Sequence, residues 1–96
     1  MIKISGIFKC KEVKQIKDSK VIKLVNSEKD KEGKWNNTYY DIWVNDKVSG
    51  MINPELKKKL TNTMLTIEGW LRVNLYGNYV NLTIYPTSIK EYMKQS

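Results

Sequence analysis

A two-residue hairpin turn near the C-terminus constrains the fold of this chain more than any other feature of its sequence. The segment Tyr76-Gly77-Asn78-Tyr79 has glycine at the first central position, as a type II′ turn requires. Because a two-residue turn fixes the register of its two strands, the facing residues can be predicted. The expected cross-strand pairs are Tyr76–Tyr79, Leu75–Val80, Asn74–Asn81, Val73–Leu82, Arg72–Thr83, Leu71–Ile84 and Trp70–Tyr85.

The two faces of this hairpin differ in chemistry. One face is wholly aliphatic and we expect all of it to be core; it holds Leu71, Val73, Leu75, Val80, Leu82 and Ile84. The other face is rich in aromatic, amide and guanidinium groups and holds Trp70, Arg72, Asn74, Tyr76, Tyr79, Asn81, Thr83 and Tyr85. Aromatic rings on an open sheet face can stack nucleic-acid bases. A subunit interface, or cover for a second layer of structure, is the alternative explanation.

Alternation of apolar and polar residues with a period of two predicts three earlier strands. The first begins at Ile2, with Gly6 as a bend or bulge, and the second covers residues 20–26. The third covers residues 38–45, where Asp41 would be buried if the opposite face were turned inward. We therefore predict that Tyr40 faces the core and that Tyr39 faces outward.

The connecting segments are polar, and only one of them is predicted to be helical. Residues 11–19 are typical of a charged turn and residues 27–37 of a long polar loop. Asn53 is a good helix N-cap and Pro54 fits the first helical position. The sequence thus predicts a mainly β protein with five strands and one short helix between the third and fourth strands. We expect one domain over residues 1–96, with a core of about residues 2–86 and a short C-terminal extension at 87–96.

The charge balance indicates a polyanionic partner. The chain has 17 lysines and arginines against 10 acidic residues, a net charge of +7, and Arg72 is its only arginine. Lysine neutralises phosphates without reading bases, although AT-rich codon usage would also enrich it. The lysines expected to contact phosphate lie in an N-terminal run, Lys9, Lys11, Lys14, Lys17, Lys20 and Lys23, with Lys34 in the polar loop.

Catalysis, metal binding and membrane insertion have little support. The chain has no histidine and only one cysteine, so it lacks the groups for a hydrolytic triad, a disulfide or a zinc site. Lys9 and Lys11 could lower the pKa of Cys10 modestly, but no second group completes a nucleophilic site. The longest apolar run, Ile42-Trp43-Val44, is far short of a membrane span. We expect a cytoplasmic protein that is not an enzyme, needs no cofactor and has no membrane partner.

The order of the predicted elements is that of the OB-fold, a five-stranded Greek-key barrel. Three stretches resemble the bacterial and phage single-stranded DNA-binding (SSB) family: residues 2–8, residues 24–28, and residues 65–72 with their Glu-Gly pair. The resemblance implies a protein that binds single-stranded DNA without sequence preference in replication or recombination. It also implies a homo-oligomer, either dimer or tetramer, with replication proteins such as helicase, primase or polymerase as possible partners.

The resemblance and the hairpin register select the same side of the sheet. The family's fourth strand uses polar, basic and aromatic residues after the Glu-Gly pair, which here are Trp70, Arg72, Asn74 and Tyr76, and its third-strand aromatic matches Tyr39 or Tyr40. We therefore expect a single-stranded DNA site formed by Trp35, Tyr39, Trp43, Trp70, Arg72, Asn74, Tyr76, Tyr79, Tyr85, Lys20, Lys23 and Lys34.

The sequence also departs from the family. It ends Lys94-Gln95-Ser96 without the family's acidic tip, and its hairpin at Gly77-Asn78 is shorter than usual. These departures suggest a minimal version from a phage or mobile element, without a hub role. Two other functions remain open. One is a primosome-type OB-fold accessory protein whose aromatic face is mainly a protein interface, and the other is an RNA-binding OB module. The strand edge at residues 2–8 is a candidate dimer contact.

Overall fold

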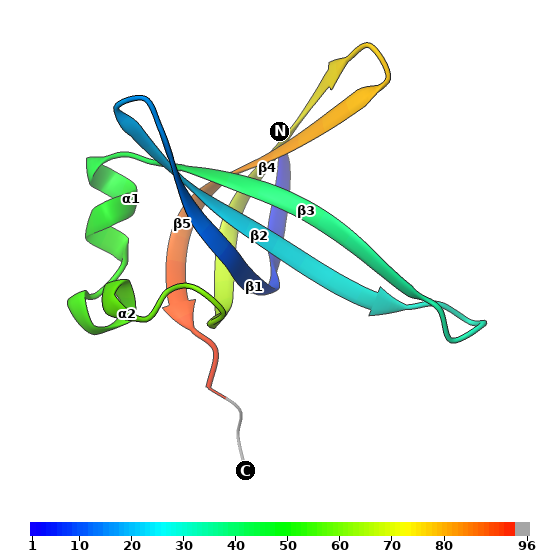
Figure 1. The fold of residues 1–96 in the computed structure, drawn as a ribbon, viewed down its shortest axis with the longest axis horizontal. Coiled ribbons are helices and arrows are strands. Elements are labelled where there is room, and N and C mark those ends of the chain that lie inside the picture. The colour runs from blue at the N-terminus through cyan, green and yellow to red at the C-terminus, as the bar shows by residue number, and fades with distance from the viewer. Residues whose placement is uncertain (94–96) are drawn as a thin grey trace.

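The computed structural model describes residues 1–93 and contains a closed five-stranded barrel (Figure 1). Its strands are β1 (Ile2–Ile16), β2 (Ser19–Lys29), β3 (Trp35–Val44), β4 (Met64–Tyr76) and β5 (Tyr79–Glu91). They close in the order β1-β2-β3-β5-β4, with β3 and β5 parallel and the other neighbours antiparallel. The expected mainly β, five-stranded architecture is confirmed.

Two short helices, rather than the single one expected, connect β3 to β4. They are α1 (Asp46–Met51) and α2 (Pro54–Lys58). The second is the predicted one, and the side chain of Asn53 accepts a 2.7 Å hydrogen bond from the Leu56 N–H. The first is capped in the same way, because the Val48 N–H donates to Asn45 Oδ1 at 2.8 Å. The sequence analysis missed α1 because it assigned Asn45 to the preceding strand and because glycine at position 50 weakens the helical pattern.

Several strands are longer than their hydrophobic pattern predicted. Residues 11–16, expected to form a turn, continue β1, and a bulge lies between Cys10 and Glu12 rather than at Gly6. The expected loop 27–37 is mostly paired strand, with a register that reaches Lys29–Trp35. These segments project beyond the barrel, where neither face of a strand is covered by the core (Figure 1). Their residues are therefore mostly polar on both faces, and the alternation of apolar and polar residues that predicts a strand is missing.

The barrel interior is formed by one cluster of apolar side chains. Its fully buried members include Ile22, Leu24, Ile42, Leu65 and Ile67, and Val48 and Leu56 extend it to the two helices. Tyr40 packs edge-on against Phe8, with ring centroids 5.2 Å apart, while Tyr39 is 55% exposed, so the predicted β3 register is confirmed.

The C-terminal boundary of the core lies further along the chain than expected. Strand β5 continues to Glu91, and Ile89 is buried in the core. Residues 87–91 therefore belong to the barrel rather than to an extension. Residues 94–96 of the expected extension lie outside the described residues.

The environment of Cys10 also differs from the expectation. The thiol is fully buried in the core cluster, on the other side of the strand from the neighbouring exposed lysines Lys9 and Lys11. Burial, together with the charge of Glu12, raises its pKa from 9.0 to about 11, whereas the sequence suggested a lowered pKa. The thiol is thus held protonated and unreactive.

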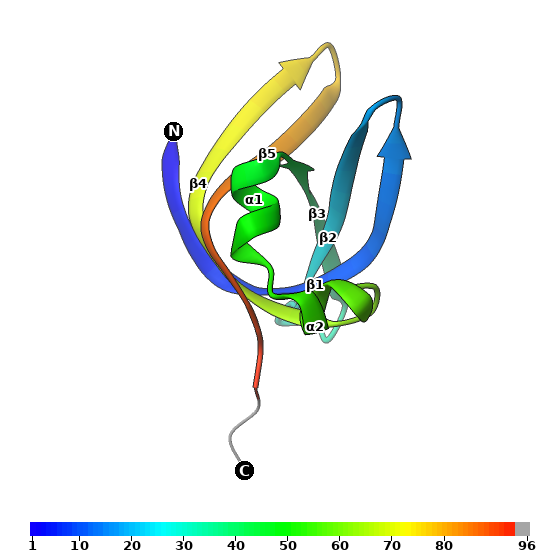
Figure 2. The same ribbon diagram turned by 90° about the vertical axis from the view of Figure 1, so that its left-hand side faces the viewer.

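The β4–β5 hairpin has the predicted register but projects away from the barrel. All seven predicted cross-strand pairs are present, and Gly77 has a φ of +61° as the turn requires. The aliphatic face is only partly core, which corrects the prediction: Ile84 is buried, Leu71 and Leu82 are half-buried, and Val73, Leu75 and Val80 are exposed. Figure 2 shows that this hairpin and the β1–β2 hairpin rise from the same end of the barrel, which leaves the distal aliphatic side chains without cover.

Candidate nucleic-acid interface

A row of three aromatic side chains crosses the outer face of β3, β5 and β4. Trp70 and Tyr85 are direct cross-strand partners. The parallel pairing of Asp41 with Thr83 brings Trp43 beside Tyr85, and these two rings line the same hollow. Trp43, Tyr85 and Trp70 are 46%, 45% and 42% exposed. Each ring is therefore held against the sheet while nearly half of its surface stays open, and together they form a platform, named here the aromatic row.

A row of polar groups lies beside the aromatic row. Lys23 Nζ lies 2.9 Å from Asp41 Oδ1, and Asn81 Nδ2 donates to Asp41 Oδ2 at 3.4 Å. Thr83, which pairs with Arg72 across β4 and β5, donates from Oγ1 to Asn81 Oδ1 at 2.9 Å. This network links β2, β3 and β5. It also means that Lys23, expected to meet phosphate, is paired with a carboxylate.

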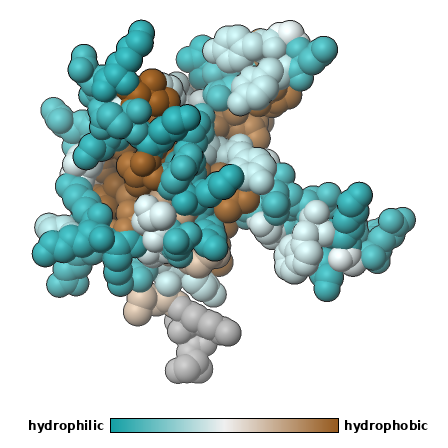
Figure 3. Space-filling view, in the orientation of Figure 1, coloured by the Kyte–Doolittle hydropathy of each residue, from teal (hydrophilic) through white to brown (hydrophobic). Residues whose placement is uncertain are grey.

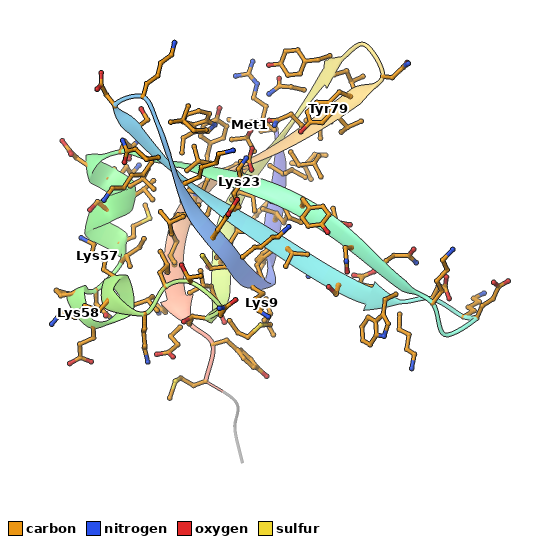
Figure 4. All side chains as sticks on the ribbon, viewed as in Figure 1. Met1, Lys9, Lys23, Lys57, Lys58 and Tyr79 are labelled. Carbon is orange, nitrogen blue, oxygen red and sulfur yellow. The ribbon has the colours of Figure 1, made fainter. Side chains whose placement is uncertain are left out.

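Two projecting arms carry the remaining predicted aromatic residues. Tyr76 and Tyr79 face each other at the tip of the β4–β5 hairpin, and each is 65% exposed. The β2–β3 arm carries Tyr39, with Lys11 Nζ 5.2 Å from its ring centroid. A groove of about 430 Å³ lies between the arms and is lined by Tyr39, Tyr79, Lys11 and Asn81 among others. Figure 4 shows Tyr79 on the projecting hairpin and Lys23 nearer the centre of the molecule.

Of the other predicted site residues, one lies on the same face of the sheet and three lie away from this groove. Asn74 pairs with Asn81 and so belongs to the same outer face. Trp35 and Lys34 lie at the far end of the β2–β3 arm, where the Lys34 N–H donates to Asp30 Oδ1 at 2.8 Å. Lys20 lies near the β1–β2 turn, on the side of the helices, and lines a different hollow.

One basic residue near an aromatic ring was missed by the sequence analysis. Lys29 Nζ lies 5.7 Å from the ring centroid of Trp35, a distance at which a cation attracts the ring face. Lys29 was assigned to a loop, whereas it pairs with Trp35 at the end of the β2–β3 ladder. Residues 27–31 are all polar, so no apolar alternation in the sequence indicated that the strand continues to Lys29.

The described chain offers no obvious metal centre. Within residues 1–93, no three histidine, cysteine, aspartate or glutamate side chains gather closely enough to hold an ion. In the same range, no helix has the length and apolar character needed to cross a membrane. Burial and the charge of Glu28 raise the pKa of Tyr40, which packs against the core and also lines the groove.

Comparison with known proteins identifies similar structures but no similar sequence. No protein-family model and no curated protein matches the chain. A small single-stranded DNA-binding protein from Streptomyces coelicolor superposes with a TM-score of 0.58 at 13% identity, covering 96% of this chain and 94% of the other. The N-terminal domain of PriB from Thermoanaerobacter tencongensis, described as dimeric, gives 0.54 at 19% identity, covering 97% and 98%. The chain therefore has the five-stranded OB-fold that the sequence predicted, in the form found in a small SSB and in PriB.

Proposed function

We propose that this protein binds single-stranded DNA without strong sequence preference, through the outer face of β3, β5 and β4. The observation that carries the proposal is the aromatic row of Trp43, Tyr85 and Trp70, which is fixed by cross-strand pairing and left nearly half exposed. Stacking of a base on such a ring contributes about 1–3 kcal/mol and tolerates any base. The likeness to a protein described as single-stranded DNA-binding supports the same function.

The strand would continue from the aromatic row into the groove between the two arms. Tyr39 and Tyr79 stand on opposite sides of that groove, and Lys11 beside Tyr39 supplies a positive charge for phosphate. The net charge of +7 adds a sequence-independent attraction that weakens with salt as counterions are released. The proposed site also includes Trp35, Tyr76, Arg72, Asn74, Lys23 and Lys34. Lys20, although expected in this site from the sequence, lines a hollow on the side of the helices and is not part of it.

Homo-oligomer formation is part of the proposal. Strand β1 pairs with β4 over Ile2–Lys9, and its pairing with β2 begins only at Lys9. Within the described chain, residues 2–8 therefore have a strand partner on one edge, and the other edge is the candidate dimer contact. Ile2, at the start of this strand, is 63% exposed, and on the projecting β4–β5 hairpin Leu75 and Val80 are 72% and 53% exposed. Exposed aliphatic surface of this kind favours burial against another chain. The dimeric state of the PriB domain agrees with this proposal.

The biological setting is a further part of the proposal. A role in replication or recombination, an origin in a phage or mobile element, and replication proteins as partners all rest on the resemblance in sequence. A cytoplasmic location and the absence of catalytic activity are proposed from the residues themselves, which include no histidine, a single cysteine and no long apolar run. The primosome-type alternative is favoured by the likeness to PriB and by the exposed aliphatic side of the hairpin, which suits a protein partner.

The decisive experiment is a fluorescence anisotropy titration of labelled oligo-dT with wild-type protein and with a Trp70→Ala/Tyr76→Ala double variant. Both side chains are exposed, so the variant is expected to fold, and it should bind roughly 30- to 5,000-fold more weakly, about 2–5 kcal/mol. Tyr92→Ala is the matched control, because Tyr92 is an exposed tyrosine beyond the end of β5.

Three outcomes would count against the proposal. If the double variant binds oligo-dT as tightly as wild type, the aromatic face is not the site. If an equal-length duplex binds as tightly as oligo-dT, stacking on single strands is not the source of affinity. If oligo-rU binds as tightly as oligo-dT at the same salt, the RNA-binding alternative is favoured instead.

A further inference from the structure

A second hollow lies on the opposite side of the molecule, between the β1–β2 hairpin and the two helices. Its volume is about 410 Å³. Its floor is aliphatic and is formed by Ile22, Val44, Ile52 and Leu60, with Val13 at one side. Figure 3 shows an apolar surface in this region, surrounded by hydrophilic side chains. We name this hollow the lysine-rimmed pocket.

The rim of the pocket is strongly basic. Lys20, Lys57, Lys58 and Lys59 line it, and among residues 1–93 no aspartate or glutamate does. Lys57 Nζ donates to Ser49 Oγ at 2.9 Å, a contact that leaves its charge intact. Lys59 Nζ lies 2.9 Å from Glu91 Oε2, so of the four rim lysines only Lys59 is paired with a carboxylate of residues 1–93. The rim therefore keeps the charge of three lysines above an apolar floor.

The combination of floor and rim defines the ligand chemistry. An apolar floor is stabilised by covering it with an apolar group, and a basic rim by pairing with anions. A DNA backbone supplies only the anions. The residues described as lining the pocket include no aromatic ring on which a base could stack. An acidic peptide carrying a large apolar side chain supplies both parts, and pockets of this volume are typical ligand sites.

We propose that the lysine-rimmed pocket binds an acidic peptide segment of a partner protein. One large apolar side chain of the segment covers Val13 and Val44, the least buried aliphatic residues of the lining, and the flanking carboxylates pair with Lys20, Lys57 and Lys58. The proposal does not depend on DNA binding by the aromatic face.

The two sites meet along the β1–β2 hairpin, where Glu12 and Lys23 line the groove and Val13 and Ile22 line the pocket. The lysine-rimmed pocket and the groove between Tyr39 and Tyr79 share no lining residue. Figure 4 shows Lys57 and Lys58 on the helix side and Tyr79 on the projecting hairpin at the other side of the view. A protein of this arrangement can hold a nucleic-acid strand on one side and an acidic partner on the other.

The probe for the test is a fluorescein-labelled hexapeptide in which aspartate alternates with leucine, titrated with the full chain at low salt. We expect saturable binding, and at least tenfold weaker binding to Lys58→Glu and to Val13→Asp, which reverse one rim charge and place a carboxylate beside the floor. Both positions are exposed, and thermal melting checks that each variant is folded. In amide NMR spectra the peptide should shift the signals of Val13, Ile52 and Leu60.

The matched controls separate this site from a general attraction to anions. Hexa-aspartate lacks the apolar side chains and should bind at least tenfold more weakly than the alternating peptide. Equal binding of the two peptides, or unchanged binding by the folded Lys58→Glu and Val13→Asp variants, would overturn the proposal. Displacement of the peptide by oligo-dT would also overturn it, because the pocket would then belong to the path of the nucleic acid.

Discussion

Replacement of Gly69 by alanine should destabilise the barrel at the point where the aromatic row is anchored. Gly69 lies at an irregularity of the β4–β5 ladder, opposite Pro86 and immediately before Trp70. A methyl group at this position would lie 2.7 Å from the Pro86 Cα and 3.0 Å from the carbonyl carbon of Tyr85, with the Tyr85 carbonyl oxygen closer still. All three neighbours are backbone atoms, so no side-chain rotation relieves the overlap.

The loss of stability can be worked out from the steric overlap, because β4 and β5 must move apart to make room for the methyl group. Overpacking of a well-packed site costs about 1–3 kcal/mol, and one weakened ladder hydrogen bond adds about 1 kcal/mol. We therefore expect Gly69→Ala to lower the free energy of unfolding by about 2–4 kcal/mol. For a domain of this size, each kcal/mol shifts the melting temperature by about 4–8 °C, so the fall should be on the order of 10–30 °C.

Urea unfolding and thermal melting, followed by far-ultraviolet circular dichroism, measure this effect. Gly50→Ala is the matched control, because nothing lies within 4 Å of a methyl group built there and Gly50 is in α1. The control should be unchanged or more stable by up to about 1 kcal/mol, since alanine favours helix. A Gly69→Ala protein that melts at the wild-type temperature would refute the close approach of β4 and β5 at this position.

Three further predictions concern the core, the thiol and the polar row. Leu82→Ala, at a half-buried position, should lower the free energy of unfolding by about 1–3 kcal/mol in urea titrations, and Leu75→Ala, at a position 72% exposed, by less than about 0.5 kcal/mol. An equal cost at Leu75 would show that its face is covered in solution. Cys10 should resist iodoacetamide at pH 8 unless urea is present, because the thiol is buried. Its raised pKa stabilises the fold fully below pH 9, and this stability, up to about 3 kcal/mol, should be lost as the pH rises through 11. Cys10→Val, measured beside wild type, should lack that part of the pH dependence, and an identical pH profile would contradict the assignment. Asp41→Asn should free Lys23 and raise the affinity for oligo-dT about 3- to 10-fold at low salt, with a steeper salt dependence; weaker binding would show that Asp41 orients the site.

Strand register and side-chain orientation were predicted correctly where a few neighbouring residues in the sequence were enough to determine them. The Gly77-Asn78 turn set the register of the β4–β5 pairs without any tertiary information. The choice between Tyr39 and Tyr40 was also decided locally, because burial of Asp41 would be costly. These two inferences correctly oriented both aromatic surfaces of the candidate site.

The errors in predicted burial and strand length arose where the strands project beyond the barrel. Sequence alternation shows which side of a strand is apolar, but not how far along the strand the barrel continues to cover that side. Val73, Leu75 and Val80 therefore looked like core although they lie on a projecting arm. The lysine-rich ends of β1 and β2 looked like turns because neither of their faces is buried. The lysine-rimmed pocket brings together β1, β2, β3 and the helical segment, and no linear pattern indicated it.

The contact between β3 and β5 is the least extensively paired junction of the barrel. In the described part of the chain, backbone pairing across this joint is limited to Asp41 and Thr83, whereas every other pair of neighbouring strands shares a long ladder. The barrel thus resembles a rolled sheet whose edges touch at one point, held there by the hydrogen bonds of Asn81. Because so few hydrogen bonds cross this seam, we expect that small rotations about it cost little and would change the width of the groove between the two arms.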